Sequence, residues 1–293
     1  MQPEIHIFGI SLKTFGIVFA LGFLSAGAVV ARRLRELGKP ADYAYEVVGA
    51  SLLGGLVGSR LYYIIQNYSL VKHDLLGSLF SGSGLVWYGG VIGGAIAVVA
   101  WARWRGMLSL ELLDLASVPL ALGYAIGRIG CQVSGDGDFG RWCYHSGTPV
   151  TCKGSQLPWS MSYPHAIVTP SGVPGKWPAG LKVQPTPIYE TVSMGLVAWW
   201  LWRVRDRFRA GALFAFYLLL SGTERLLVEF LRRNHRILLG LTVPQLESIA
   251  AMVAGALWLF LLLRRGGLMR QQEPAATTAK AGAAAAPAGA TSG

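Results

Sequence analysis

Apolar residues occur in seven long stretches that are separated by short polar or glycine-rich segments. A helix that crosses a bilayer needs about 20 mostly apolar residues, and somewhat fewer where flanking side chains reach the interface. The stretches are near that length, so the pattern predicts a bundle of roughly seven transmembrane helices. The predicted spans are Leu12 to Ala31, Tyr45 to Ile65, Leu85 to Ala102, Leu110 to Ile129, Pro187 to Trp202, Gly211 to Leu231 and Pro244 to Leu263.

The composition agrees with this pattern. Of 293 residues, 53% are hydrophobic and only 14% are charged, and the mean hydropathy is +0.44. These values exclude a soluble enzyme, a disordered protein and a disulfide-dense secreted module, and they indicate an all-α integral membrane protein. The first apolar stretch lacks a small-residue cleavage site and continues into Arg32 and Arg33, so we expect it to remain as a helix rather than to be removed as a signal peptide.

The formal net charge is +11, but the basic residues fall in short bursts between apolar stretches rather than along one polar face. Such bursts are topology signals rather than a nucleic-acid surface. They predict an outside N-terminus, a cytoplasmic C-terminus and an outer loop around Lys72. The basic loops contain Arg32, Arg33, Arg35 and Lys39, then Arg103 and Arg105, then Arg203, Arg205, Arg207 and Arg209, then Arg264 and Arg265. An exception is the cluster of Arg232, Arg233 and Arg236 at an outer end, which calls for a functional explanation.

Two segments lie outside this helical pattern. Residues 130–185 are rich in Gly, Pro, Ser and Trp and predict a small extracytoplasmic cap, in which Cys143 and Cys152 either form a disulfide or stay as free thiols. Residues 271–293 form a low-complexity tail that cannot bury a core. We therefore expect a transmembrane domain over residues 1–270 and a disordered cytoplasmic tail over 271–293.

Ionisable residues gather near the outer ends of the predicted helices: Arg60 in the second, Arg128 in the fourth, and Arg225 with Glu229 in the sixth. Such residues are costly at membrane depth and usually face a cavity or bind a charged group. Converging arginines favour bidentate recognition of a phosphate, here that of a lipid head group. Two alternatives stay open: Arg225 and Glu229, four residues apart, can form a purely structural pair, and interfacial arginines can reach ordinary lipid phosphates.

Other chemistry is weakly supported. The sequence "GDGDFG" resembles a metal loop, but it lacks the remaining oxygen ligands of a calcium site. Cys131 has no histidine near it in sequence, and an unpaired cysteine in a membrane helix usually serves packing. A phosphate-binding glycine loop, a serine-nucleophile elbow and zinc-ligand spacing are missing from the sequence. We therefore predict no metal and no cofactor.

Seven motifs together resemble the bacterial prolipoprotein diacylglyceryl transferases, and the similarity extends over most of residues 10 to 265. The glycine–arginine signature and the paired Arg and Glu of the sixth helix are specific in combination. The motifs are "GSRLYY", "WYGGVIGG", "GRIGCQVSGDGDFG", "LPWSMSYP", "QPTPIYE", "ERLLVEFLR" and "TVPQLESI".

The resemblance implies an enzyme of the bacterial plasma membrane that moves diacylglyceryl from phosphatidylglycerol to the lipobox-cysteine thiol of a prolipoprotein signal peptide. It implies essential cations at Arg128 and Arg225, a signature carboxylate at Asp136, and Glu229 as the partner of Arg225. It further implies lipid binding by Arg128, Arg60, Arg232, Gln132, Ser134, Gly140, Tyr189 and Glu190. Guanidinium groups suit this reaction because the leaving group is a phosphate ester, and fixed guanidinium donors stabilise the negative charge that develops on it.

The sequence departs from the family pattern at several positions. Tyr88 replaces a usual histidine and becomes a candidate proton relay together with Asp136; Phe15 replaces a tyrosine and Cys131 an asparagine. The signature has one extra residue, and Gln184 takes the place of another common histidine. A diverged phospholipid-dependent transferase with another acceptor, and a non-catalytic lipid-binding protein, are therefore the alternative hypotheses. A transporter is disfavoured because the charges gather near one membrane face.

Overall fold

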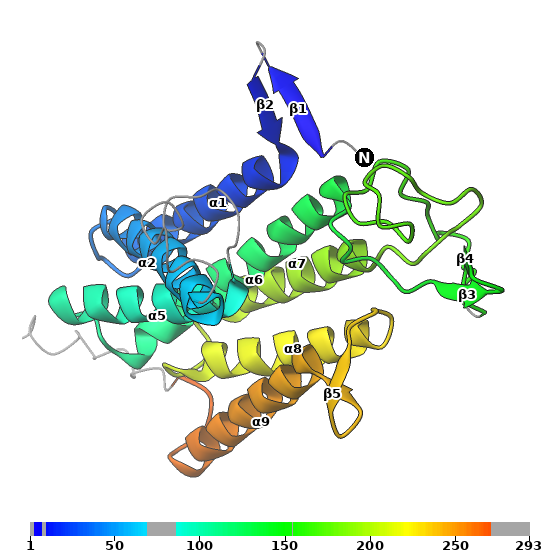
Figure 1. Ribbon diagram of the computed structural model, residues 1–293. Helices are drawn as coiled ribbons and strands as arrows, with labels where there is room; N and C mark the ends of the chain where they lie inside the picture. Colours follow the sequence, from blue (N-terminus) through cyan, green and yellow to red (C-terminus); the bar gives the residue numbers. More distant parts are fainter. Residues whose placement is uncertain (1–2, 8–9, 69–85, 154, 271–293) are drawn as a thin grey trace, which may run out of the picture.

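A computed structural model describes residues 3–7, 10–68, 86–153 and 155–270. Within these ranges the chain forms seven α-helices (Figure 1). They are α1 (Thr14–Glu36), α2 (Tyr43–Gln66), α5 (Trp87–Trp104), α6 (Leu110–Ser134), α7 (Thr186–Val204), α8 (Ala212–Glu229) and α9 (Val243–Arg264). The predicted loop around Lys72 and the predicted tail 271–293 lie outside the described residues.

Each predicted span coincides with one of these helices, and the boundaries differ by only a few residues. By length and composition, α1, α2, α6 and α9 are apolar enough to cross a membrane. The sequence of α8 carries three ionisable residues, Glu224, Arg225 and Glu229, which lower its average hydropathy. The described chain is thus mostly helical, with four candidate membrane spans among the residues searched.

Glycines allow α2 and α5 to pack backbone against backbone. A side-chain carbon added at Gly58 would overlap the Gly89 carbonyl oxygen and lie 2.8 Å from the Gly93 Cα atom. Such close approach is typical of helix pairs in lipid, where small residues form the contact. Gly54 and Gly58, four residues apart on α2, both lie in this interface. On α5 the tightest contacts come from Gly89 and Gly93 instead of the neighbouring Gly90 and Gly94, which also face α2 but less closely.

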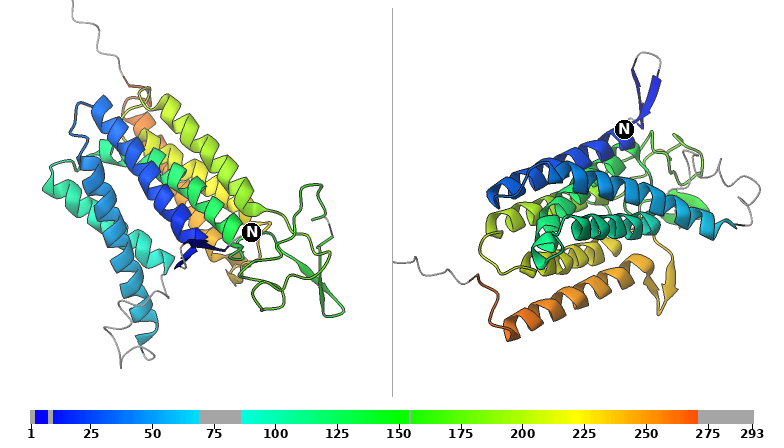
Figure 2. Two further views of the ribbon diagram at one scale, coloured as in Figure 1. Left: turned by 90° about the horizontal axis from the view of Figure 1, so that it is seen from above. Right: turned by 90° about the vertical axis from the view of Figure 1, so that its left-hand side faces the viewer.

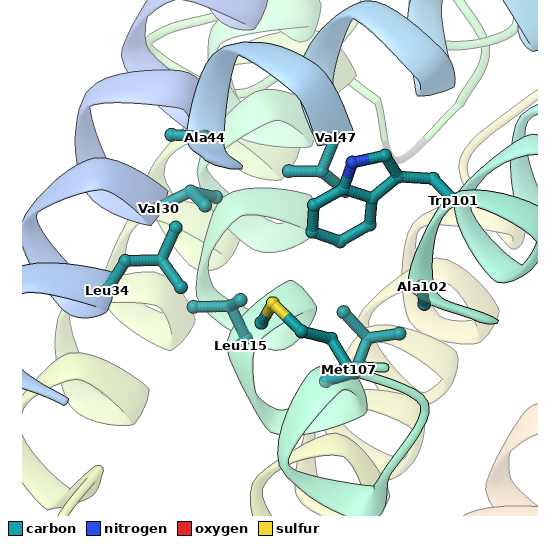
Figure 3. Packing of buried hydrophobic residues seen from close by; sticks show 9 residues of the cluster. Val30, Leu34, Ala44, Val47, Trp101, Ala102, Met107 and Leu115 are labelled. Atoms are coloured by element: carbon teal, nitrogen blue, oxygen red, sulfur yellow. The ribbon is translucent and has the colours of Figure 1, made fainter. Parts of the chain in front are cut away.

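A hydrophobic core joins α1, α2, α5 and α6 (Figure 3). Leu34 and Ala44 are almost completely buried in it, beside Trp101 and Met107. The Trp101 indole donates a hydrogen bond of 2.8 Å to Glu46, which also pairs with Arg105. These contacts fix the α5–α6 turn against the start of α2. Elsewhere α6 packs along α1 and α7, and α8 packs along α9.

The segment between α6 and α7, residues 135–185, has a small core of its own. The rings of Phe139, Trp142, Tyr163 and Trp177 pack against one another there. Cys143 and Cys152 form a disulfide, so the paired alternative of the sequence analysis is confirmed. Cys143 is the first residue of a short hairpin that consists of β3 (Cys143–His145) and β4 (Thr148–Val150).

Two further hairpins were not predicted from the sequence: β1 (Glu4–Ile7) with β2 (Ile10–Lys13), and β5 (Arg236–Leu238) with β6 (Leu241–Thr242). The first precedes α1, and the second connects α8 to α9. Both lie at the end of the bundle that also holds the 135–185 segment (Figure 1). The two further views show the same grouping (Figure 2). The C-terminal end of α6, the N-terminal end of α7 and the C-terminal end of α8 therefore meet at this end.

Candidate functional site

Three arginines converge on one buried carboxylate at this end of the bundle. Glu190, near the start of α7, has a fully buried side chain. Its Oε1 atom lies 3.0 Å from Arg225 Nη1 and 3.5 Å from Arg232 Nη1, and its Oε2 atom lies 3.3 Å from Arg128 Nε. Glu190 therefore joins α6, α7, α8 and the segment after α8. We call these four residues, together with Asp138 and Glu229, the arginine–carboxylate cluster.

Asp138 forms a second bridge within the cluster, because its carboxylate pairs with both Arg128 and Arg232. The chain reaches this position through a tight turn in which Gly135 and Gly137 have φ values of 65° and 98°. L side chains rarely adopt such values, so the glycines allow α6 to end and the chain to reverse. Thr186 Oγ1 donates to the Asp138 carbonyl and ties the turn to the start of α7.

The sequence analysis favoured Asp136 as the carboxylate of this motif, but the ion pairs with Arg128 and Arg232 are made by Asp138. Asp136 lies beside the Cys131 thiol, and its carboxyl oxygen accepts a 3.3 Å hydrogen bond from the Asp138 amide. Burial raises the pKa of Asp136 above its usual 3.8. Asp136 thus supports the turn, whereas Asp138 contacts the guanidinium groups.

The structure places Arg232 in the cluster. The basic group at the end of α8 that breaks the topology rule includes an arginine whose side chain is only 6% exposed. Burial lowers its pKa to about 10, so Arg232 keeps its charge at neutral pH. The neighbouring Arg233 lies over the Trp142 ring, 3.7 Å from its centroid, and Arg236 is exposed on β5.

The predicted pair on α8 also exists. Arg225 Nη2 lies 3.5 Å from Glu229 Oε2, one helical turn away. The other Glu229 oxygen accepts hydrogen bonds of 2.7 Å from Asn234 and from Thr242. Because Thr242 also caps the N-terminus of α9, Glu229 connects the cluster to the hairpin and to α9. Glu229 is thus a member of the cluster and also a structural link between α8 and α9.

Sequence reasoning missed Tyr124 and Glu224. The Tyr124 hydroxyl donates to Glu190 at 2.8 Å and accepts from Arg128 at 3.3 Å, and its ring lies 4.9 Å beneath the guanidinium carbon. The signal for Tyr124 was its position one turn before Arg128. Glu224 is buried next to Arg225 in sequence and accepts a hydrogen bond of 3.2 Å from Ser193.

Tyr88 lies in the first turn of α5, within electrostatic reach of Arg225 in the cluster. Its hydroxyl lies close enough to the Glu247 carboxylate on α9 and to Arg225 to interact electrostatically with both. Its ring contacts that of Tyr62 on α2, with centroids 6.4 Å apart. Glu247, in the sequence motif "TVPQLESI", was not singled out as a site residue. The tyrosine that replaces a histidine therefore has a carboxylate partner.

Of the remaining predicted lipid-binding residues, Gln132, Ser134, Gly140 and Tyr189 lie within four residues of a cluster member along the chain. Gln132 accepts a 3.1 Å hydrogen bond from Tyr163, and Tyr189 accepts one of 2.6 Å from Trp159. Both residues thereby anchor the 135–185 segment. Ser134 is buried at the end of α6, and the Gly140 amide donates to the Gln184 carbonyl at 2.8 Å. Arg60 is buried on α2 with an exposed fraction of 7%.

Possible metal ligands also meet here. Ligand atoms of Cys131, Asp136 and Asp138 lie within 4.8 Å of one another. Both Asp138 oxygens already pair with arginines, whose guanidinium groups supply positive charge at this point. A buried group of fixed guanidinium donors is suited to bind a phosphate and to stabilise negative charge that develops on it.

The fold and the site define a membrane protein with a cationic, carboxylate-braced site at one end of its helices. The family model for prolipoprotein diacylglyceryl transferase matches residues 3–261. Proteins named phosphatidylglycerol–prolipoprotein diacylglyceryl transferase are similar to the chain along most of their length. That of Clostridium tetani is 30% identical over 240 residues, which cover 80% of this chain and 87% of the relative.

Two further relatives support the match. The protein of Leptospira interrogans is 30% identical over 76% of this chain and 72% of its own length, and a second enzyme of this name from Clostridium perfringens is 28% identical over 86% and 91%. The chain belongs to the prolipoprotein diacylglyceryl transferase family, which confirms the resemblance seen in its motifs. It is a multi-pass membrane protein of that family.

Proposed function

We propose that this protein transfers the diacylglyceryl group of phosphatidylglycerol to the lipobox-cysteine thiol of a prolipoprotein signal peptide. The observation that carries the proposal is the convergence of Arg128, Arg225 and Arg232 on Glu190 and Asp138. Family membership supplies the reaction class, and the cluster supplies the groups that a phosphate ester requires.

In this reaction the thiolate sulfur of the acceptor attacks the glyceryl carbon of the lipid that carries the phosphate. The carbon–sulfur bond forms while the carbon–oxygen bond breaks, and the electron pair leaves with glycerol phosphate. Arg128 and Arg225 hold the phosphate and stabilise the charge that develops on it. Glu190 and Asp138 fix the orientation of the guanidinium groups, each of which has further N–H donors for the substrate.

The acceptor thiol must also lose its proton. A free thiol has a pKa near ~8.5, and nearby positive charge lowers that pKa. We assign the transfer of the proton to Tyr88, which passes it to the neighbouring Glu247 carboxylate. Tyr88 interacts electrostatically with Arg225, so the base lies on the phosphate-binding side.

The membrane arrangement follows from the charges. We assign all seven helices as spans of the bacterial plasma (inner) membrane, with the N-terminus outside and the C-terminus cytoplasmic. The 135–185 segment is then the extracytoplasmic cap, and the cluster lies at the outer membrane edge, where lipid phosphates are found. Residues 1–270 form the transferase domain, and 271–293 form a cytoplasmic tail.

The test is transfer of radiolabelled diacylglyceryl from phosphatidylglycerol to a lipobox-cysteine peptide by the purified protein in detergent. We expect labelled peptide with the wild type and with Arg103→Ala, an exposed arginine on α5. Arg128→Ala and Arg225→Ala should be expressed but should transfer no label. Normal transfer by Arg128→Ala would refute the phosphate-site assignment. An inactive but folded wild type would favour another acceptor or lipid binding without chemistry.

A further inference from the structure

A cavity of about 470 Å³ lies at the end of the bundle opposite the arginine–carboxylate cluster. Its wall includes Asp114 at the start of α6, whereas Arg128 lies near the end of the same helix. At a rise of ~1.5 Å per residue the two positions are about 20 Å apart along the helix axis. The cavity is therefore separate from the proposed transferase site, and it has a volume typical of small-molecule sites.

Five arginines line this cavity: Arg33, Arg205, Arg209, Arg265 and Arg270. They come from distant parts of the chain, and backbone pairing together with one side-chain hydrogen bond holds the last three together. The Arg209 amide donates to the Leu268 carbonyl and the Arg270 amide to the Arg207 carbonyl, each at 2.9 Å. The Arg209 side chain adds a 3.0 Å hydrogen bond to the Arg265 carbonyl. The α7–α8 loop and the segment after α9 thus form one basic wall.

The carboxylates around the cavity already have ion-pair or hydrogen-bond partners. Glu36 pairs with Arg33 at 3.1 Å and with Arg205 at 2.9 Å. The two oxygens of Asp114 accept backbone hydrogen bonds from Gly211 and Phe214 at the start of α8. Glu111 lies 3.5 Å from Lys39.

Three positive charges of the wall are left without a carboxylate. In the part of the chain that the structure describes, Arg209, Arg265 and Arg270 have no ion-pair partner. Guanidinium groups without a counter-ion favour a phosphate ester as ligand, because their N–H donors match its oxygens in pairs.

The deeper part of the cavity is apolar and is lined by Leu115, Val118 and Leu213. A ligand that fills both parts is amphipathic, with a phosphate at the arginines and hydrocarbon at the floor. We propose that this cavity is a second phosphate-ester site, occupied by the head group of an anionic phospholipid of the adjacent leaflet. Basic pockets between membrane helices bind anionic lipids on the cytoplasmic side, which is this side in the proposed orientation.

The positive-inside rule accounts for arginines at this end, but it requires neither a cavity nor the hydrogen bonds that bring three of them together. The proposal does not depend on the transfer reaction, since its readout is binding. Two double variants separate the explanations. Arg265→Ala/Arg270→Ala removes two unpaired cavity arginines, and Arg203→Ala/Arg264→Ala removes two exposed arginines of the same end that stack on Trp199 and Phe260.

The experiment measures binding of phosphatidylglycerol and of phosphatidylcholine to the full-length protein in neutral detergent, by native mass spectrometry and thermal shift. Each variant also carries Arg128→Ala, so that lipid held at the cluster does not mask the second site. Glycerol 3-phosphate is the water-soluble probe. We expect the cavity variant to bind phosphatidylglycerol about tenfold more weakly than the control variant does.

If only phosphatidylglycerol stabilises the protein, the ligand is a lipid. If glycerol 3-phosphate stabilises it too, the site accepts either phosphate ester. Equal losses in the two double variants would overturn the proposal, because they would reflect only the basic charge of this end. Equal affinity for phosphatidylcholine and phosphatidylglycerol would overturn it too. If the cavity variant unfolds, Arg265→Gln/Arg270→Gln, which keeps hydrogen-bonding side chains, replaces it in the same comparison.

Discussion

Glu190 Oε1 lies 3.0 Å from Arg225 Nη1, and the same carboxylate contacts Arg128 and Arg232. One buried carboxylate therefore contacts three guanidinium groups that come from separate segments of the chain. This relationship makes Glu190 the centre of the cluster rather than one lipid ligand among several. Its removal is expected to affect the fold and the reaction together.

Glu190→Gln should lower both stability and transfer. Removing one partner of a buried ion pair costs about 3–5 kcal/mol, because the remaining charges lose their compensation. The measurement is the thermal midpoint in detergent beside the rate of label transfer. The control is Asp206→Asn, whose 60% exposed carboxylate also touches two arginines. Surface pairs contribute about 0–1 kcal/mol, so equal shifts in the two variants would contradict this assignment.

Asp138→Asn should reduce transfer more than Asp136→Asn. Asp138 pairs with Arg128 and Arg232, whereas Asp136 contacts the Cys131 thiol and the Asp138 amide. An amide at position 138 leaves two guanidinium groups without their orienting charge. The rate of diacylglyceryl transfer, measured at a temperature at which both variants are folded, decides between the two carboxylates. A larger loss in Asp136→Asn would restore the role that the sequence motif suggested.

The stability of the protein should fall as the pH rises through the titration of Asp136. Burial raises the pKa of this carboxyl above 3.8, so the folded state holds the proton to higher pH than the unfolded state. The free energy of unfolding then decreases with pH in the window between the two pKa values, and the contribution is fully present below it. When the free energy of unfolding is measured from about pH 4 to 7, the Asp136→Asn variant should lack this decrease with pH. Parallel curves for the two proteins would show that Asp136 does not titrate differently on folding.

Tyr88→Phe should slow transfer about 100-fold or more if the hydroxyl passes the thiol proton to Glu247. Glu247→Gln should slow transfer by a similar factor. The double variant should be little slower than either single variant, because both residues act in the same proton transfer. Tyr62→Phe is the control, because its ring contacts Tyr88. An unchanged rate in Tyr88→Phe would reduce Tyr88 to a packing residue.

Gly58→Ala should separate α2 from α5 and lower the thermal midpoint. The added carbon would overlap the Gly89 carbonyl oxygen, and overpacking of this kind costs about 1–3 kcal/mol. Gly49→Ala on the same helix is the control, because a carbon added at Gly49 meets no atom within 4 Å in the described structure. Equal thermal midpoints in both variants would mean that the helices can move apart freely.

The helices were predictable because a single physical requirement, enough apolar length to cross a bilayer, determines them. The hairpins β1–β2 and β5–β6 were not, since each strand has at most four residues, and the alternation of polar and apolar residues in β1 and β2 is too short to identify a strand. The choice of Gly89 and Gly93 over Gly90 and Gly94 for the closest contact of α5 with α2 was not predictable either. Four glycines in one helix fit the same spacing rule, and only the position of the neighbouring helix selects between them.

The site was predictable where chemistry and position coincide in the sequence, as for Arg128, Arg225 and the unusual Arg232. It was not predictable where contacts join distant segments, because Glu190 meets Arg128, Arg225 and Arg232 only after α6, α7 and α8 pack. Asp136 and Asp138 are two residues apart in one glycine-rich turn. Which of them faces the arginines depends on the positive φ values of Gly135 and Gly137, which spacing alone does not reveal.

The disulfide between Cys143 and Cys152 links this protein to the redox state of its surroundings. Such bonds form in oxidising compartments, so in the proposed orientation the cap matures only after it has crossed the membrane. Cys131, the remaining thiol, is buried on α6 and is thereby kept from exchanging with the bridge. In the proposed orientation, this member of the transferase family therefore acquires its disulfide only on the outer side of the membrane, where thiols are oxidised.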